Sequence, residues 1–120
     1  TLVPSTSIAY LTDFGFSETN LKALKNSWKR VTSVVCETSF QDKDRDRALK
    51  TSHLSTIQAA LIAGYLEADE LIPFHISILY GTNQEASMKE CLENFHHYKG
   101  LSPEELEQEI STELQRDLSQ

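Results

Sequence analysis

The chain has 120 residues, 39% of them hydrophobic, which is enough for one packed domain, yet no apolar run reaches the length of a membrane span. Its formal net charge is −7, and residues 101–120 carry −5 of it because six acids there are opposed by Arg116 alone. Neither this acidic end nor the remaining hundred residues offer the basic face of a module that binds nucleic-acid phosphates.

The N-terminal third predicts a strand, a helix and a second strand. Residues 7–13 form a short apolar run broken by Asp-Phe-Gly, so we expect a strand that ends near Asp13. Ser17 is a candidate N-cap for a helix that has one apolar face and reaches about Trp28. Residues 31–36 are rich in β-branched side chains and almost continuously apolar, which is typical of a buried strand.

Charged residues dominate the segment 41–50, where we expect a short exposed helix or a loop. Its four cations are predicted to form a solvated face: Lys43, Arg45, Arg47 and Lys50. We predict the same for the cations of residues 22–30. Cys36 and Cys91 match no metal or redox spacing, so we expect two reduced thiols in the core of a cytoplasmic protein.

The central segment predicts a helix followed by a strand. Ser55 and Gln58 have the spacing of a capping box, which starts a helix just after His53. The residues after Gln58 are apolar on almost every side, so we expect other elements to cover this helix widely. Residues 71–76 form a third strand, and Pro73 places it at an edge of the sheet or makes it irregular, because proline cannot donate to a ladder.

Two further helices close the chain. The first has an apolar stripe at helical spacing: Met88, Cys91, Leu92 and Phe95. The second begins with a capping box at Ser102 and Glu105, with proline at its first helical position. The alternation of strands and helices predicts an α/β layered fold. We expect residues 1–100 to form the main unit and the acidic helix 101–120 to pack on it or on a partner.

Four segments in chain order carry polar residues at the end of an apolar run or just before one. They are Ile8-Ala-Tyr-Leu-Thr-Asp13, Cys36-Glu37-Thr38-Ser39-Phe40, His53-Leu-Ser-Thr-Ile-Gln-Ala-Ala and Leu71-Ile-Pro-Phe-His75-Ile-Ser-x-x-Tyr80. Together they resemble ribonuclease Z and its close relatives of the metallo-β-lactamase fold. The resemblance implies that the chain is the C-terminal half of an αββα sandwich and belongs to a zinc-dependent hydrolase.

The resemblance implies a centre of two zinc ions that clamp the attacking water and the leaving oxygen. Asp13 would bridge the ions and His75 would be a terminal ligand. On position alone, Asp13 would be a turn residue and His75 a satisfied histidine at the end of a strand; the four segments together favour the ligand roles. His96 and His97 point about a hundred degrees apart on a helix, which indicates a solvated helix end instead of a metal site.

The resemblance also implies a catalytic pair. His53 would donate a proton to the leaving oxygen, and Glu37 would orient and support its imidazolium form. The alternative is a histidine and a glutamate on separate exposed loop edges. Ser77 and Tyr80 would contact the substrate.

Two features depart from the family. Its first metal motif, His-x-His-x-Asp-His, does not occur in the sequence, so most zinc ligands would come from an N-terminal half of a longer protein or from another chain. Leu79 stands where the family commonly has arginine, and leucine cannot bind a phosphate. This favours a smaller phosphodiester, or another ester, over RNA.

A second hypothesis follows from the same departures: the chain is a non-catalytic interaction module that retains half of the fold. Half of a two-sheet sandwich exposes the face that the other half covers. We therefore expect this chain to associate with the missing half or with a second copy of itself, and we expect no membrane partner.

Overall fold

The computed structural model describes residues 8–12, 15–27, 31–51, 53–74, 76 and 84–118. The described elements, in chain order, are β1 (Ile8–Leu11), α1 (Glu18–Ser27), β2 (Ser33–Glu37), the 3-10 helix η1 (Asp42–Asp44), α2 (Arg45–Thr51), α3 (Thr56–Tyr65), β3 (Glu70–Phe74), α4 (Gln84–Lys99) and α5 (Pro103–Leu118). The predicted α/β class is confirmed. None of these described helices is long and apolar enough to cross a membrane.

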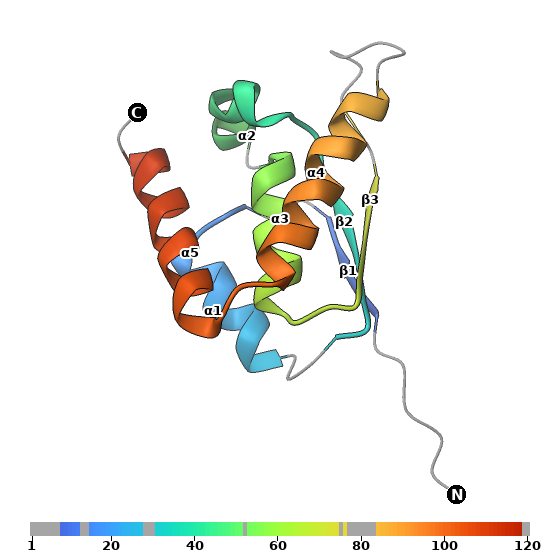
Figure 1. The fold of residues 1–120 in the computed structure, drawn as a ribbon. Helices are drawn as coiled ribbons and strands as arrows, with labels where there is room; N and C mark the ends of the chain where they lie inside the picture. Colours follow the sequence, from blue (N-terminus) through green and yellow to red (C-terminus); the bar gives the residue numbers. More distant parts are fainter. Residues whose placement is uncertain are drawn as a thin grey trace, which may run out of the picture.

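The three described strands form one parallel sheet in the order β1-β2-β3. Val34 in the middle strand pairs with Ala9 on one side and with Leu71 on the other. β3 lies at an edge of this sheet, as Pro73 predicts. The helices gather on one side of the sheet, with α3 and α4 next to it (Figure 1).

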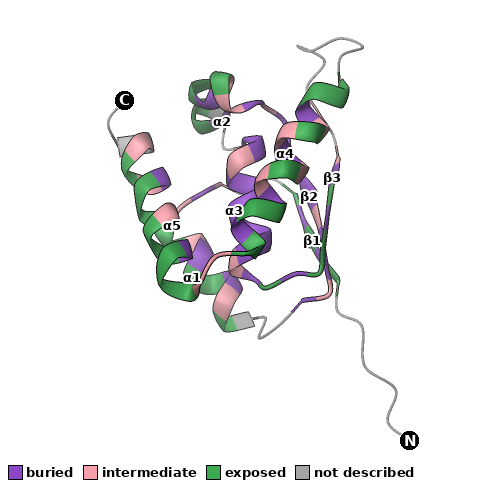
Figure 2. Ribbon diagram, viewed as in Figure 1, coloured by how far each residue is buried: buried purple, intermediate pink, exposed green. Residues whose placement is uncertain are grey.

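Helix α3 is the centre of the core. All its residues except Ile57 and Tyr65 are buried, as the all-round apolar pattern predicts, and α4 and α5 both pack against it (Figure 2). The predicted capping box is present: the Ser55 hydroxyl accepts from the Gln58 N–H at 3.2 Å, and the Gln58 side chain accepts from the Ser55 N–H at 3.1 Å. A Cβ on Gly64 would lie 3.3 Å from Tyr98 Cβ, so the glycine lets α4 approach closely.

The acidic helix α5 also begins as the sequence predicts. The Ser102 N–H donates to the Glu105 carboxylate at 3.1 Å, and the Glu105 N–H donates to the Ser102 hydroxyl at 3.2 Å. These hydrogen bonds lower the pKa of Glu105. The apolar stripe of α5 then buries Leu106 and Ile110. Packing of α5 against α3 is thus part of this fold.

The sheet face opposite the helices exposes three apolar side chains in the described part of the chain, beside a polar pair at one end in which the Ser33 hydroxyl donates to Glu70 at 2.6 Å. Ile8, Tyr10 and Ile72 are exposed by 58%, 64% and 44%, and they share this face because Tyr10, Val35 and Ile72 are aligned across the three strands. The Tyr10 and Phe74 rings stack across β2 with centroids 5.3 Å apart. Exposed apolar side chains gathered on one face are found at interaction surfaces.

Several predicted features lie outside the described residues, among them the end of the first strand at Asp13, the helix end at Trp28 and the strand end at His75. The described strands belong to a single sheet, so the second sheet of the predicted sandwich stays a prediction. The division of the chain into residues 1–100 and 101–120 also stays a prediction.

The two thiols of the core have strongly perturbed acidity. Burial raises the pKa of Cys36 to about 12, and burial also raises the pKa of Cys91. Both residues are fully buried free cysteines, as the sequence predicts.

We predict that the folded protein loses stability as the pH rises above about 9. The unfolded thiols ionise near their ordinary pKa of 9.0, whereas the folded ones stay protonated until pH 12 or beyond. Each thiol therefore lowers the free energy of unfolding by about 1.4 kcal/mol per pH unit in that range. Urea denaturation at pH 8, 9 and 10 measures the slope. Cys91→Ala should reduce the slope of the free energy of unfolding against pH. An unchanged slope in that variant would show that the buried Cys91 thiol does not cause the loss of stability.

Candidate functional site

His53 and Glu37 come together at the carboxyl end of the sheet. Glu37 is the last residue of β2, and His53 lies just before α3. His53 Nδ1 is 3.3 Å from Glu37 Oε1, and the two side chains are 29% and 10% exposed. Within the described part of the chain, Nδ1 makes no aligned hydrogen bond, so the interaction is an ion-pair contact when the imidazole is protonated. The two groups do not lie on separate loop edges.

Backbone hydrogen bonds extend β2 toward His53 and hold it there. The N–H groups of Ser39 and Phe40 donate to the Leu54 carbonyl at 3.1 and 3.4 Å, and the Thr56 N–H donates to the Phe40 carbonyl at 2.8 Å. His53 itself donates its N–H to the Ala48 carbonyl of α2 at 2.9 Å. The backbone of His53 is therefore held in two ways. Its neighbour Leu54 is bound to the residues that follow β2, and its own N–H is bound to α2.

The two ring nitrogens of His53 differ in their surroundings. Nδ1 faces the Glu37 carboxylate, so Nε2 is the ring nitrogen that does not face it. Reactive groups of α/β folds gather at the carboxyl ends of strands, because the loops that leave the sheet meet there. The pair thus lies where reactive groups of such folds are found, and a histidine and a glutamate are residue types that can take part in proton transfer.

The other predicted site residues, Asp13, His75, Ser77 and Tyr80, lie outside the described residues. Among the residues that the structure does describe, no group of three histidine, cysteine, aspartate or glutamate side chains is placed to hold a metal ion. His96 and His97 are exposed near the end of α4, as the sequence predicts.

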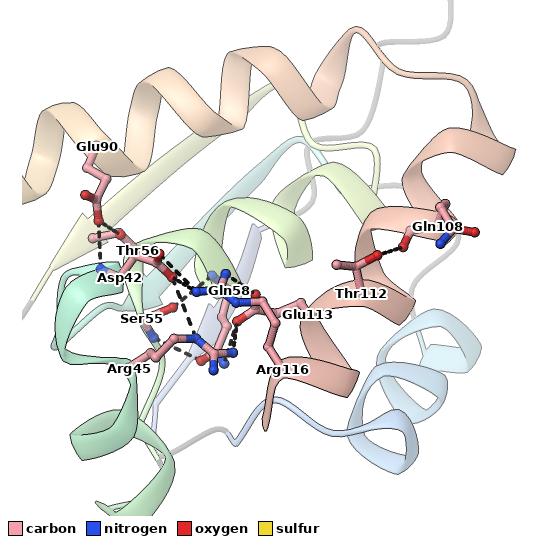
Figure 3. Close-up of polar contacts among 10 residues, drawn as sticks. All are labelled: Asp42, Arg45, Ser55, Thr56, Gln58, Glu90, Gln108, Thr112, Glu113 and Arg116. Carbon is pink, nitrogen blue, oxygen red and sulfur yellow. Dashed lines mark hydrogen bonds and ion pairs between the residues drawn. The ribbon is translucent and has the colours of Figure 1, made fainter. Parts of the chain in front are cut away.

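A buried polar network ties α2 and α3 to α5 (Figure 3). Arg45 Nη2 is 2.6 Å from Glu113 Oε1, with only 7% and 3% of the two side chains exposed. Arg116 contacts the other Glu113 oxygen at 3.0 Å and both carboxylate oxygens of Asp42 at 3.2 Å. Gln58 joins through a 3.3 Å hydrogen bond from Nε2 to Glu113. The network thus holds the segment that leads to His53 against the C-terminal helix.

A second polar cluster fixes the start of the same segment to α4. The Gln41 side chain donates to the Ser87 hydroxyl at 2.9 Å, and both groups are buried. The Glu90 carboxylate accepts from the Asp42 N–H at 2.9 Å and from the Thr56 hydroxyl. Glu90 therefore joins the beginnings of η1 and α3, so the residues from Gln41 to Thr56 are anchored at both ends.

The prediction of a solvated cationic face is wrong for Arg45, which is 6% exposed, although Lys43, Arg47 and Lys50 are exposed. Glu113, in the acidic terminal segment, is likewise 2% exposed. The sequence offers one indication that Glu113 is buried: it directly precedes Leu114 of the apolar stripe, which places it at the edge of the buried face of the helix. The sequence around Arg45, its partner 68 residues earlier in the chain, gives no such indication of burial.

The described elements define an α/β domain with a parallel sheet, and His53 and Glu37 lie at the carboxyl end of that sheet. No protein-family model matches the chain. A curated relative, ribonuclease Z of Deinococcus radiodurans, is 35% identical to it over 86 residues, which are 72% of this chain and 25% of the relative. The chain therefore spans about a quarter of the length of the curated relative that it matches.

We predict that Glu113→Ala lowers the free energy of unfolding by about 3–5 kcal/mol, because it leaves Arg45 buried without its closest anion. Urea denaturation followed by circular dichroism measures the change. The double variant Arg45→Met with Glu113→Leu should lose less than Glu113→Ala alone, since it removes both buried charges.

The matched control is Glu107→Ala, a glutamate on the exposed face of the same helix, for which we expect a change within about 0.5 kcal/mol. Equal losses of unfolding free energy for Glu113→Ala and Glu107→Ala would show that removing one partner of the buried ion pair has no specific effect on stability.

Proposed function

We propose that this chain is the C-terminal half of a zinc-dependent hydrolase of the ribonuclease Z type, which acts on phosphodiesters when the remainder of the protein is present. The observation that carries the proposal is the 3.3 Å contact between His53 and Glu37 at the carboxyl end of β2. The partial similarity to ribonuclease Z supports it, since hydrolysis of phosphodiesters requires a proton donor for the leaving oxygen.

In this proposal His53 delivers a proton from Nε2 to the leaving oxygen as the bond to phosphorus breaks. Glu37 orients the ring in this proposal, because its carboxylate lies 3.3 Å from Nδ1. The anchoring of His53 to Ala48 and of its neighbour Leu54 to β2 limits the motion of the donor. Glu37 is therefore a positioning residue, and His53 is the catalytic one.

Zinc enters through the sequence resemblance, and the donors suit it: imidazole nitrogen and carboxylate oxygen are ordinary zinc ligands. Asp13 and His75 would hold the metal in this half. Two residues are fewer than the three protein ligands of a single catalytic zinc, so further ligands must come from outside this chain. When bound, zinc supplies an activated hydroxide and neutralises charge on the phosphate.

The open apolar sheet face supports the proposal that another part of the protein completes the fold. Face-to-face packing of two sheets is a common way to bury such a face, and the relative is about four times as long as the matched segment. We propose that a second sheet from the missing half covers Tyr10 and Ile72. In the absence of that half, a second copy of the chain takes its place.

A non-catalytic interaction module is the second candidate function. The specific observation in its favour is that the sheet exposes Tyr10 and Ile72 on the face opposite the helices. Metal content of the complete polypeptide separates the two candidates: about two zinc ions per chain are expected for the hydrolase and none for the module.

We predict that the complete polypeptide hydrolyses bis-p-nitrophenyl phosphate, and that His53→Ala lowers kcat by about 10²–10⁴-fold, without loss of zinc, on a phosphodiester whose leaving group is an alkoxide and needs a proton. Asp13→Ala and His75→Ala should lose both zinc and activity. Steady-state kinetics and metal analysis of the same samples give the two readouts. His96→Ala is the matched control because His96 is an exposed histidine on α4. Unchanged activity in His53→Ala, Asp13→Ala or His75→Ala would overturn the proposal.

We also predict that the 120-residue chain associates in solution through the sheet face. Tyr10→Glu or Ile72→Glu should shift sedimentation velocity profiles toward the monomer, because a charge would have to be buried in the contact. Leu49→Glu is the control, since Leu49 is 43% exposed but lies on α2, away from the sheet. A wild-type chain that sediments as a stable monomer would contradict the prediction.

A further inference from the structure

A cavity of about 620 Å³ lies where the carboxyl ends of α1, α3 and α4 meet, at the opposite end of α3 from His53. It is lined by Lys25 near the end of α1, Tyr65 at the end of α3 and Lys99 at the end of α4. The beginning of α5 and the turn between α3 and β3 complete its walls. Pockets of roughly 300–1,000 Å³ enclose whole small ligands, so this cavity is large enough for an organic molecule.

The floor of this cavity is apolar and packed. Tyr98 and Leu106 are 7% and 8% exposed, and both belong to the hydrophobic core. Gly64 lies beside them, since a Cβ on it would be 3.3 Å from Tyr98 Cβ and 3.6 Å from Leu106 Cδ1. Leu101 packs against the same core and adds a further apolar side chain. A bound molecule would meet a preformed apolar surface, which lowers the entropic cost of binding.

The two lysines of the wall already have partners on the main chain. The Lys25 ammonium donates to the Tyr65 carbonyl at 2.9 Å and lies 5.0 Å from the centroid of the Tyr65 ring. The Lys99 ammonium donates to the Asp69 carbonyl at 2.9 Å. Carbonyls at the carboxyl end of a helix carry a partial negative charge, which a nearby ammonium group offsets. Both lysine charges are thus matched within the wall itself.

The charges without such a match are carboxylates. Glu67 and Glu107 are exposed lining residues, and within the described part of the chain their carboxylates make no hydrogen bond or ion pair. The pKa of Tyr98 is raised to about 12, first by burial and then by the carboxylates of Glu109 and Glu113, which belong to the same helix as Glu107. The cavity therefore combines an apolar floor with a negatively charged rim.

Glu67 takes its place on this rim in an unfavourable backbone conformation. Its φ is 56°, in the left-handed region that favours glycine. The Glu67 N–H donates to the Gly64 carbonyl and the Ala68 N–H donates to the Ala63 carbonyl, both at 3.0 Å, which is the pattern of a Schellman motif. Glycine is the usual residue at this position of the motif, so the turn by itself does not account for the glutamate.

We propose that this cavity binds a small organic cation, a primary amine on an apolar body. The apolar body lies against Tyr98 and Leu106. The ammonium group faces the carboxylates of Glu67 and Glu107, which an anion of the same shape would repel. Binding here is independent of the proposed hydrolysis, because the cavity does not include the candidate catalytic pair.

The test is a titration of the ¹⁵N-labelled 120-residue chain with phenethylammonium and, separately, with 3-phenylpropanoate, followed by nuclear magnetic resonance. The two compounds have similar aromatic bodies and opposite charges. We expect phenethylammonium to shift the amide signals of residues 64–69, 99 and 101 saturably, with a dissociation constant on the order of millimolar. The anion should leave these signals unchanged. No shift with the amine, or equal shifts with both compounds, would overturn the proposal.

Glu67→Gly separates binding from stability. Glycine adopts a positive φ freely, so the midpoint of urea denaturation should rise or stay unchanged, whereas loss of the carboxylate should weaken phenethylammonium binding about threefold. The double variant with Glu107→Gln should weaken binding about tenfold. Glu85→Gln is the matched control, because Glu85 is an exposed glutamate at the other end of α4 from Lys99. A double variant that binds the amine like the wild type counts against the site.

A third compound, Nα-acetyl-lysine amide, tests the source of the amine. It presents the ammonium group as a side chain of a protein segment would, on an aliphatic stem instead of an aromatic body. We expect it to bind more weakly than phenethylammonium, because the stem covers less of the apolar floor. Equal or tighter binding would overturn the assignment to a free small amine and indicate a basic protein segment instead.

Discussion

Burial of α3 on nearly every side is the constraint on which the rest of this structure depends. A helix without a polar face has to be covered by other elements, and here the sheet, α4 and α5 each cover a part of it. Gly64 allows the close approach of α4 that this covering needs. Since α3 starts immediately after His53, the packing that buries the helix also determines where the histidine lies.

The polar residues at the start of α3 define how this helix is placed relative to α2 and α5. Ser55 and Gln58 cap the helix, and the same Gln58 side chain reaches Glu113 on α5. Glu113 lies between Arg45 and Arg116, so one carboxylate connects α2, α3 and the C-terminal helix. A buried ion pair of this kind contributes little net stability compared with apolar packing, but its removal on one side is costly. Arg45 belongs to α2, which also accepts the His53 N–H through the Ala48 carbonyl, so the ion pair and the backbone of His53 are joined to the same helix.

The two faces of the sheet have opposite environments, and this difference connects the fold to the proposed function. The helix-covered face carries Ala9, Val34 and Leu71, all buried. The opposite face presents Tyr10 and Ile72 to solvent. The chain spans about a quarter of its curated relative, exposes apolar side chains on one sheet face and brings His53 and Glu37 together, and these three features are the ones on which the proposal of a completed site rests.

The sequence by itself determined the elements, because local rules govern them: the caps at Ser17, Ser55 and Ser102, the edge strand with Pro73, and the all-round apolar pattern of α3 follow from residues only a few positions apart. The tertiary structure alone decided which distant groups meet. Glu37 and His53 are placed side by side by the extension of β2, and Arg45 is buried against Glu113 although its own segment is rich in exposed charges. Such pairings depend on how the elements pack in three dimensions, and a pattern along the chain carries no information about a partner 68 residues away.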